Sequence, residues 1–412
     1  MFDPSTIFHL EESPTLNLNR ISKEREANGL KVYKFGFGES PFEPPQFVID
    51  ALSDNANLTH YSKVEGPRNL RQRISNFHNN ANQLNLDPEQ IIIGPGSKIL
   101  IFSILRAIKS ADVFLASPSW VSYRPQIEMC GHHLINIETT FEDRWRITLN
   151  NFKEALQKKQ HKHSIIIINY PGNPDGLSYQ EDEMSDLVQC FKDHNCVLIS
   201  DEIYGLLNFN GNHQSFMSHY PECTIITSGL SKWCGAGGWR FGFAAFGSKL
   251  ESLTNAVKGI GSETYSCVSS PVIAAAERAY QNFDEMKPYL NWQIAILQSL
   301  ADYCYSELVA KGLICHPSVG GFYLFPDFEN FREKLAKRGI INAVSLCKQL
   351  LDETGVALLP AQAFGMPPDS LQARLAYVDF KCSEELEAFS VATTAPQIKE
   401  GISKLNEWLT NL

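Results

Sequence analysis

The sequence predicts an α/β protein whose main part is a largely parallel β-sheet covered by helices on both faces. Short, almost continuously apolar runs rich in β-branched residues alternate with helix-length segments between residues 91 and 246. This alternation is typical of parallel sheets buried on both faces. The chain also has 412 residues, 43% of them hydrophobic. Because one core usually divides at this size, we expect more than one domain.

The N-terminal segment, residues 1–45, is polar and interrupted by prolines. We expect a helix at 21–28 and a strand at 31–35 within it. A segment this poor in apolar residues cannot bury a core alone, so it should pack on another domain or subunit. A helix at 45–55 follows, and another should begin after Gly66-Pro67, because proline suits the first turn of a helix.

The central region predicts a seven-stranded sheet. The expected strands are 91–93, 113–116, 133–138, 164–169, 196–200, 223–227 and 241–246. The helix-length segments between them are 98–109, 121–130, 149–159 and 179–194. Ligands of such sheets bind at the carboxyl ends of the strands, where the polar residues discussed below also lie.

The C-terminal part changes pattern. A long helix at 285–310 precedes a strand pair around 320–325 and a final helix at 397–409. We therefore expect a smaller α+β domain there, with three divisions in all. Residues 1–45 form an arm and part of the small domain, 46–285 a large domain, and 286–412 the small C-terminal domain.

Net charge and cysteine spacing limit the kinds of ligand that the protein is expected to bind. The net charge is −10 and no basic block tracks a phosphate backbone, so we expect a small-molecule ligand and no nucleic acid. The ten cysteines form no CxxC pair or zinc-type cluster, which favours free thiols, no metal and a cytoplasmic location. No signal peptide or membrane-length apolar run is present.

Lys232 stands in an unusual setting. It follows an apolar strand and precedes a glycine-rich loop, and Arg240 comes eight residues later. If the lysine is buried, desolvation lowers its pKa and supplies the neutral amine that Schiff-base chemistry needs. The alternative is a half-exposed lysine of a surface loop.

The segment Gly94-Pro95-Gly96-Ser97-Lys98 leads a strand into a helix. Backbone N–H groups at a helix N-terminus bind anions, most often phosphate. The spacing fits neither the P-loop nor the dinucleotide fingerprint. Lys98 opposes the helix dipole unless an anion compensates, or else it simply points into solvent.

Four further candidates lie at strand ends. Asp201 ends an apolar strand, so its carboxylate is at a ligand site, or buried and paired, or a helix cap. Tyr204 and Asn173 could place polar groups beside the same ligand. Trp120 is either a core residue or a stacking platform for a flat ring.

Three motifs, in this order along the chain, carry a resemblance to a known family. They are Asn173-Pro174-Asp175-Gly176, Asp201-x-x-Tyr204, and Ser231-Lys232 with Arg240 eight positions on. Together they resemble the class I/II aminotransferases, the fold-type I enzymes that use pyridoxal 5′-phosphate (PLP), and the similarity runs from about 36 to 375. It implies a large PLP-binding domain with a mainly parallel sheet, a small domain made from both chain ends, and a homodimer with active sites at the interface.

The resemblance implies roles at the cofactor ring. Lys232 would form the aldimine with PLP and then move the proton between substrate Cα and cofactor. Asp201 would keep the pyridine nitrogen protonated, so that the ring accepts electrons. Tyr204 and Asn173 would hydrogen-bond the ring's phenolic oxygen.

The resemblance also implies a phosphate site. Arg240 would grip the phosphate, helped by the amides of Ser97 and Lys98 and by a hydroxyl of Ser228 or Ser231.

Further binding residues follow from the same likeness. Trp120 would stack on the ring, and Tyr61 would reach the phosphate of the partner subunit. Arg374 would bind the substrate α-carboxylate, helped by the backbone of Gly38 and by Asn173.

Some residues depart from the family pattern. Asp175 replaces the usual threonine, Gly229 stands where many members have a phosphate-binding serine, and Phe241 replaces a smaller aliphatic residue. None removes a catalytic group, but the hydroxyl donor to the phosphate stays unassigned.

The substrate is less determined than the cofactor. The stretch 258–264 lacks the arginine with which some aspartate aminotransferases bind the distal carboxylate, whereas Lys98 matches a lysine that does so in a related subgroup. The resemblance thus favours a dicarboxylate donor such as aspartate. Glu39 and Glu263 would instead favour a cationic or polar amino acid.

Two other functional classes share these residues. A PLP-dependent lyase, decarboxylase or oxidase would use the same groups, because reaction choice depends on which Cα bond lies perpendicular to the ring. A non-catalytic binding module with the same fold is disfavoured by the Lys232 and Asp201 pair.

Overall fold

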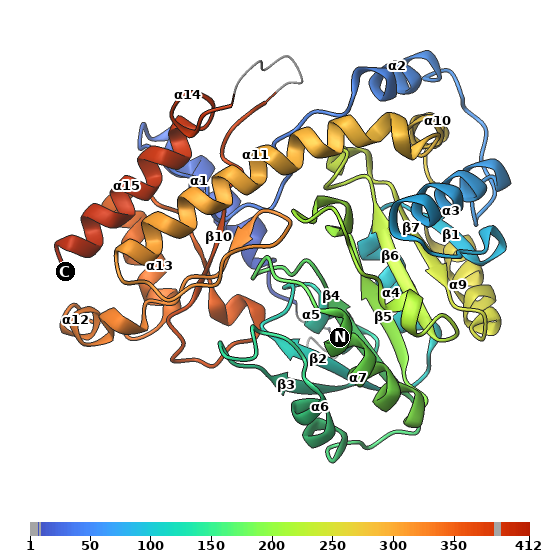
Figure 1. Ribbon diagram of the computed structural model, residues 1–412, viewed down its shortest axis with the longest axis horizontal. Helices are drawn as coiled ribbons and strands as arrows, with labels where there is room; N and C mark the ends of the chain where they lie inside the picture. Colours follow the sequence, from blue (N-terminus) through green and yellow to red (C-terminus); the bar gives the residue numbers. More distant parts are fainter. Residues whose placement is uncertain (1–6, 8–9, 383–388) are drawn as a thin grey trace, which may run out of the picture.

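The computed structural model describes residues 7, 10–382 and 389–412, and its centre is a seven-stranded sheet (Figure 1). The strand order is β1-β7-β6-β5-β4-β2-β3. All neighbouring pairs are parallel except those of β7, which is antiparallel to β1 and to β6. The strands are β1 Ile91–Gly94, β2 Asp112–Ser117, β3 His133–Glu138, β4 Ser164–Asn169, β5 Val197–Asp201, β6 Thr224–Gly229 and β7 Gly242–Phe246.

The sheet is buried on both faces because its strands alternate apolar side chains between two cores. Along β4, Ile166 and Ile168 join one cluster, and Ile165 and Ile167 join another. The first cluster packs under α6 Leu149–Leu156, α7 Glu181–Asp193 and α8 Phe216–His219. The second packs under α4 Ser97–Ala107, α5 Tyr123–Met129 and α9 Glu251–Thr264. Continuous apolar strands of this kind are expected in a sheet covered on both sides.

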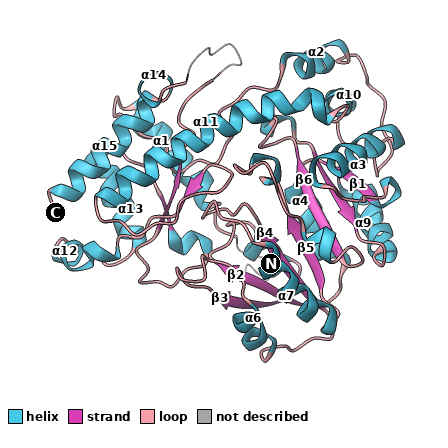
Figure 2. Ribbon diagram, viewed as in Figure 1, coloured by secondary structure: helices cyan, strands magenta, loops and turns pink. Residues whose placement is uncertain are grey.

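A second, three-stranded sheet in the order β8-β10-β9 lies apart from the first (Figure 2). Its strands are β8 Tyr323–Leu324, β9 Leu359–Pro360 and β10 Ala373–Ala376, all antiparallel. The helices of this part are α12 Arg332–Lys337, α13 Ala343–Thr354, α14 Val391–Thr394 and α15 Pro396–Thr410.

The longest helix, α11 Phe283–Ala310, runs from the side of the large sheet to the C-terminal helices (Figure 1). Its buried face belongs to one continuous apolar cluster that holds residues of β1, β6 and β7 together with residues of α13 and α15. The remaining helices are α1 Pro14–Ala27, α2 Gln46–Asp54, α3 Arg68–Asn82 and α10 Ser270–Ala279. The boundary expected near 285 falls in the first turn of α11, and the division into domains stays a prediction.

The expected α/β fold with a mainly parallel seven-stranded sheet is confirmed, and each of the seven expected strands is present. The strand expected at 31–35 is wrong, because there only Tyr33 forms an isolated bridge, to Val356. The strand pair expected around 320–325 is also wrong in its pairing. β8 pairs with β10, about fifty residues later, a long-range partner that local pattern cannot reveal.

Short 3₁₀ turns connect several of these elements. They are Pro88–Gln90, Gly205–Leu207, Gly237–Trp239, Glu329–Phe331 and Ala361–Phe364. Among the helices of the described residues, none is long and apolar enough to cross a membrane.

Candidate functional site

A cavity of about 460 Å³ opens at the carboxyl ends of β4, β5 and β6. Its walls come from the large sheet, from the N-terminal arm and from the three-stranded sheet. Eleven residues predicted from the sequence line it: Gly38, Ser97, Lys98, Trp120, Asn173, Asp201, Tyr204, Ser231, Lys232, Arg240 and Arg374. The fold therefore gathers in one cavity side chains that lie more than three hundred positions apart.

Lys232 follows β6 and points its amine into the cavity. Its Nζ donates a hydrogen bond of 2.5 Å to the backbone oxygen of Gly38 in the N-terminal arm. Burial, together with the positive charge of Arg374, lowers the pKa of Lys232 from its ordinary value of 10.5 to about 8. The neutral amine, which a nucleophile or a base requires, is therefore far more accessible near neutral pH than in an ordinary lysine.

Asp201 ends β5, the central strand, and its carboxylate is buried. It accepts hydrogen bonds from the Tyr123 hydroxyl at 2.6 Å and the Thr227 hydroxyl at 3.1 Å. Burial raises the pKa of Asp201 to about 6, although these two hydrogen bonds oppose the rise. A buried carboxylate that lacks a cationic partner in this arrangement is suited to bind a positively charged group of a ligand.

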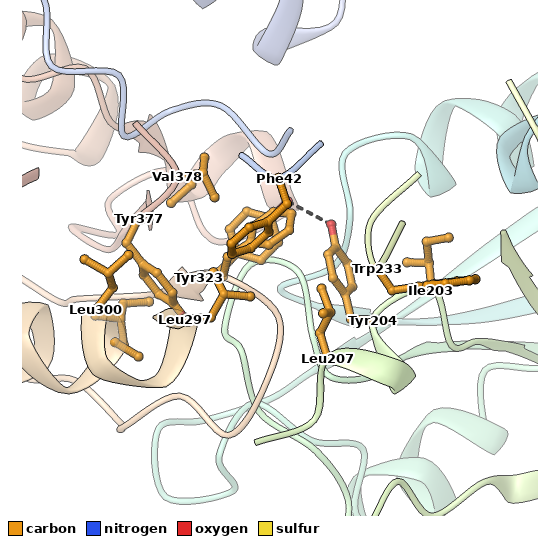
Figure 3. Packing of buried hydrophobic residues seen from close by; sticks show 14 of the residues in the cluster. Phe42, Ile203, Tyr204, Leu207, Trp233, Leu297, Leu300, Tyr323, Tyr377 and Val378 are labelled. Atoms are coloured by element: carbon orange, nitrogen blue, oxygen red, sulfur yellow. Dashed lines mark hydrogen bonds between the residues drawn. The ribbon is translucent and has the colours of Figure 1, made fainter. Parts of the chain in front are cut away.

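Tyr204 links the two sheets. Its hydroxyl lies 2.8 Å from the hydroxyl of Tyr323 on β8, and Figure 3 shows the two side chains pointing toward one another within the buried cluster. Burial raises the pKa of both hydroxyls, so both stay protonated and able to donate. A Cβ on Gly38 would lie 2.1 Å from the Tyr323 hydroxyl, so only glycine lets the arm approach this pair.

Arg374, on β10, is buried and extends towards the large sheet. Its Nη1 donates to the side-chain oxygen of Asn173 at 2.9 Å, and its Nη2 donates to the backbone oxygen of Gly36 at 2.7 Å. Its Nε is buried without a hydrogen-bond partner among the described residues. The Tyr323 ring lies 4.7 Å from the guanidinium carbon. Such a charged fork has donors to offer to a carboxylate.

An anion cradle forms where β1 enters α4. Gly96 has φ +96°, a conformation that favours glycine, and a Cβ there would lie 2.3 Å from a guanidinium nitrogen of Arg240. Gly242 is equally constrained, because a Cβ on it would lie 2.4 Å from the amide nitrogen of Ser97. The first N–H groups of α4 have no partner within the helix, so with Arg240 they can hold a phosphate.

Lys98 and Trp120 form the outer wall of the cavity. The Lys98 amine lies 5.1 Å from the centre of the Trp120 ring, within cation–π range. Lys98 is accessible from the cavity, yet the surrounding walls desolvate it and lower its pKa, and the charge of Arg240 adds to this effect. The ammonium can therefore face a negatively charged part of a ligand.

The departures from the family pattern have structural explanations. Asp175 forms a buried ion pair with Arg146 and accepts the Leu177 amide at 2.8 Å. A serine at position 229 would not fit, because a Cβ on Gly229 would lie 2.4 Å from the backbone oxygen of Phe241. Phe241 is itself fully buried and packs against Tyr280.

Two predicted residues do not line this cavity. Ser228 is buried within β6, whereas Ser231 faces the cavity, so Ser231 is the better candidate for the phosphate hydroxyl. Tyr61 is 91% exposed and lies beside a separate surface hollow with His60 and Ser270. Glu263, weighed as a specificity residue, lies on α9 outside the cavity, whereas Glu39 lines it.

Sequence reasoning missed Tyr123, Tyr323 and Thr15 as lining residues. Tyr123 stands six residues after the end of β2, in the segment that holds Trp120, and this position could have suggested it. Tyr323 lies in an apolar run that reads as core, and Thr15 lies in a polar arm, so neither gave a local signal. In the described part of the chain, no group of three His, Cys, Asp or Glu side chains could hold a metal ion.

Comparison with known proteins agrees with this geometry. The family described as "Aminotransferase class I and II" matches residues 31–385. An aspartate aminotransferase of Bacillus subtilis is 31% identical over 379 residues, which cover 89% of this chain and 92% of the relative. An asparagine–oxo-acid transaminase of Streptococcus mutans is 26% identical over 98% of both chains.

Solved structures share the fold. An aspartate aminotransferase of Thermus thermophilus with maleate has a TM-score of 0.85 at 22% identity, with 97% of each chain covered. The aspartate aminotransferase of Rhizobium meliloti has a TM-score of 0.86 at 23% identity, covering 100% of this chain and 99% of that chain. These likenesses establish the architecture on which the site is built.

Proposed function

This chain belongs to the class I and II aminotransferase family, and we propose that it uses PLP to move an amino group between a dicarboxylic L-amino acid such as aspartate and a 2-oxo acid. The observation that carries the proposal is the convergence of Lys232, Asp201 and Arg374 in one cavity. Lys232 supplies an amine for the reactive carbon of the cofactor, and Asp201 supplies a buried carboxylate for the ring nitrogen. Arg374 supplies a guanidinium for the substrate α-carboxylate.

The residues present fit PLP. The anion cradle suits the phosphate of PLP. Because Gly96 has no Cβ, the guanidinium of Arg240 can lie directly against the loop that leads into α4. Asp201 suits a protonated ring nitrogen, because it is buried and its side-chain hydrogen bonds come from two neutral hydroxyls, those of Tyr123 and Thr227. Tyr204 and Asn173 would hold the ring oxygen, and Lys232 would hold the reactive carbon. When bound, PLP provides the electron sink that makes the Cα–H bond of an amino acid acidic.

Lys232 is the group that moves the proton. With PLP bound, its neutral amine would accept the proton from substrate Cα, and its ammonium form would donate a proton back. A pKa of about 8, well below the ordinary value of 10.5, brings the neutral form within reach near neutral pH. The backbone oxygen of Gly38 accepts a hydrogen bond from this amine and so holds it at the cavity floor.

Arg374 orients the substrate. Its guanidinium binds the α-carboxylate, and Asn173 fixes the guanidinium plane through the 2.9 Å hydrogen bond. Substrate bound this way places Cα near Lys232, since both side chains line the same cavity.

Lys98 supports the choice of a dicarboxylate. It lines the same cavity as Arg374 but comes from α4 rather than from β10, and Thr15 of the arm also lines it. An amino acid held by Arg374 at one carboxylate can offer a second carboxylate to Lys98. The relatives named as aspartate aminotransferases are consistent with this assignment.

We also propose a homodimer in which the exposed Tyr61 reaches the phosphate of the partner's site. A tyrosine 91% exposed on a monomer surface is expected where a second subunit packs. Free thiols at Cys130, Cys190, Cys196 and Cys234 suit a reducing, cytoplasmic setting.

A screen of amino donors tests the function. Single turnover with aspartate should yield one equivalent of the 2-oxo acid and convert the bound cofactor to its amine form. A lyase would instead release ammonia and return the original cofactor, and a decarboxylase would release carbon dioxide. Cofactor binding without turnover of any amino acid would indicate a binding module.

A further inference from the structure

A second buried carboxylate lies directly beside Asp201. Glu202 follows it at the end of β5, and its side chain is 4% exposed. Every hydrogen bond to this carboxylate comes from a buried side chain. The donors to Oε1 are the hydroxyls of Ser200 at 2.7 Å, Ser215 at 2.6 Å and Tyr170 at 3.0 Å, and the donor to Oε2 is Nε2 of His213 at 2.9 Å.

This arrangement keeps Glu202 ionised. Burial by itself raises the pKa of Glu202, but hydrogen bonds from His213, Ser215 and Ser200 outweigh it and hold the pKa below its usual value. Nδ1 of His213 is buried without a partner among the described residues. The carboxylate of Glu202 is therefore fixed in place by four buried donors, and His213 is its nitrogen donor.

The same network ties together the two segments that reach the proposed ring. Tyr170 opens the loop that carries Asn173, and its hydroxyl also accepts the Phe216 amide at 2.9 Å. On the other side, the ring of His213 packs against the backbone that follows Tyr204, where a Cβ on Gly205 would lie 2.9 Å from it. Without the hydrogen bonds to Glu202, the loop that carries Asn173 and the backbone after Tyr204 would both be less firmly held.

The charge of Glu202 also reaches the site. It raises the pKa of Asp201, although less than burial does. Two adjacent carboxylates at one strand end generate a negative potential that a cation on the ligand would relieve.

We propose that Glu202, held by His213, is a positioning residue of this site: it fixes Asp201 and Tyr204 against the Asn173 loop, and its charge favours a cationic ring nitrogen beside Asp201. This inference rests on the proposed PLP-dependent function. The carboxylate of Glu202 does not line the cavity, so it acts through Asp201 and the backbone.

Glu202→Gln tests the charge, because glutamine is of nearly equal size and can still accept from the three hydroxyls. Asp112→Asn is the matched control. Asp112 is also fully buried and paired with a histidine, His133, at 2.7 Å, but it begins β2, at the amino ends of the parallel strands, whereas Glu202 follows the carboxyl end of β5. Both variants remove one buried carboxylate charge, so both lose stability of the same kind.

Two readouts are measured on the dimeric full chain: the dissociation constant of PLP, and the pH midpoint of the absorbance change of the bound cofactor. Loss of a nearby negative charge destabilises cations, so E202Q should weaken PLP binding about tenfold and lower the midpoint by about one pH unit. D112N should leave both values unchanged. A wild-type midpoint and affinity in E202Q, or equal losses in E202Q and D112N, would overturn the proposal.

His213 provides a second test should E202Q fail to fold. His213→Gln keeps an N–H donor for Glu202, whereas His213→Leu removes it, so only H213L should weaken PLP binding and lower the midpoint. Equal behaviour of the two variants would contradict the positioning role. If the wild-type protein itself does not bind PLP, the proposed function fails instead, which is a separate outcome.

Discussion

The guanidinium of Arg374 donates a 2.9 Å hydrogen bond to the side-chain oxygen of Asn173, although the two residues stand 201 positions apart. One lies on β10 of the small sheet, and the other lies in the loop after β4 of the large sheet. The contact therefore joins the two sheets at the point where a substrate carboxylate would bind. We therefore expect binding of the amino acid to depend on this contact between the two sheets.

Replacing Arg374 with lysine should weaken binding of the amino acid. Lysine keeps the charge but cannot hydrogen-bond Asn173 and a carboxylate together in one plane. We expect kcat/KM for aspartate to fall by about 10²-fold or more, which corresponds to loss of one charge-assisted hydrogen-bond pair. Steady-state kinetics measure this. Unchanged PLP affinity in the same variant would show that the cofactor site is intact.

Replacing Lys232 with alanine should abolish turnover and the borohydride-reducible link to PLP. A positioned acid–base group alone contributes about 10²–10⁴-fold to the rate, and in the proposed function Lys232 would also hold the cofactor. Lys249→Ala is a suitable control, because Lys249 is exposed and follows β7 away from the cavity. Retained activity in K232A would refute the assignment of this site.

Lys98 should discriminate between substrates. If its ammonium binds a distal carboxylate, K98A raises KM for aspartate about tenfold or more but leaves KM for alanine nearly unchanged. The comparison is made with the same preparation of enzyme, so errors in cofactor content cancel. Equal changes for aspartate and alanine would show that Lys98 serves the phosphate or the fold instead.

Asp201 should make the stability of the cofactor-free protein fall as pH rises. Its pKa is about 6 when folded, against an ordinary value of 3.8, so the folded state binds more protons between these values. The contribution of Asp201 to the free energy of unfolding is then largest below pH 4. It falls by on the order of 3 kcal/mol as the pH rises to 6. Denaturant unfolding of the apoprotein measures the slope, and D201N should remove it. A wild-type slope no different from that of D201N would contradict the assignment.

Asp175→Asn should destabilise the protein, because Arg146 would remain buried without its ionic partner. Loss of one partner of a buried pair costs about 3–5 kcal/mol. Denaturant unfolding gives the value, with Glu142→Gln at an exposed position as the control. The double variant D175T/R146M removes both charges and should recover most of the loss, and a double variant as unstable as D175N would show that the pair itself is not the cause.

Much of the fold was predictable because the buried strands are locally distinctive. The run Ser164–Asn169 is apolar at four successive positions, and this alone indicates a strand covered on both faces. Short strands of the second sheet were not predictable in the same way. The pairing of Tyr323 with Ala376 depends on a partner about fifty residues away, and a two-residue strand has no period to detect.

The residues of the site also divide into those that the sequence could predict and those that it could not. Asp201 and Lys232 could be selected from the sequence because a charge at the end of an apolar strand costs free energy unless a ligand or partner compensates. Tyr123 and Tyr323 could not, because a tyrosine in an apolar run is compatible with an ordinary core. Their hydroxyls become informative only when the hydrogen bonds to Asp201 and Tyr204 are known.

The sequence by itself determined the fold class, the family and the chemical groups at the strand ends, because apolar periodicity and motif spacing are local properties. Only the tertiary structure decided which groups meet: that Arg374 reaches Asn173, that Ser231 rather than Ser228 faces the cavity, and that Glu202 is held by His213 behind Asp201. The first is a contact between segments 201 positions apart, and the other two depend on how loops fold at the ends of β5 and β6. Tertiary packing sets this geometry, and no local pattern records it.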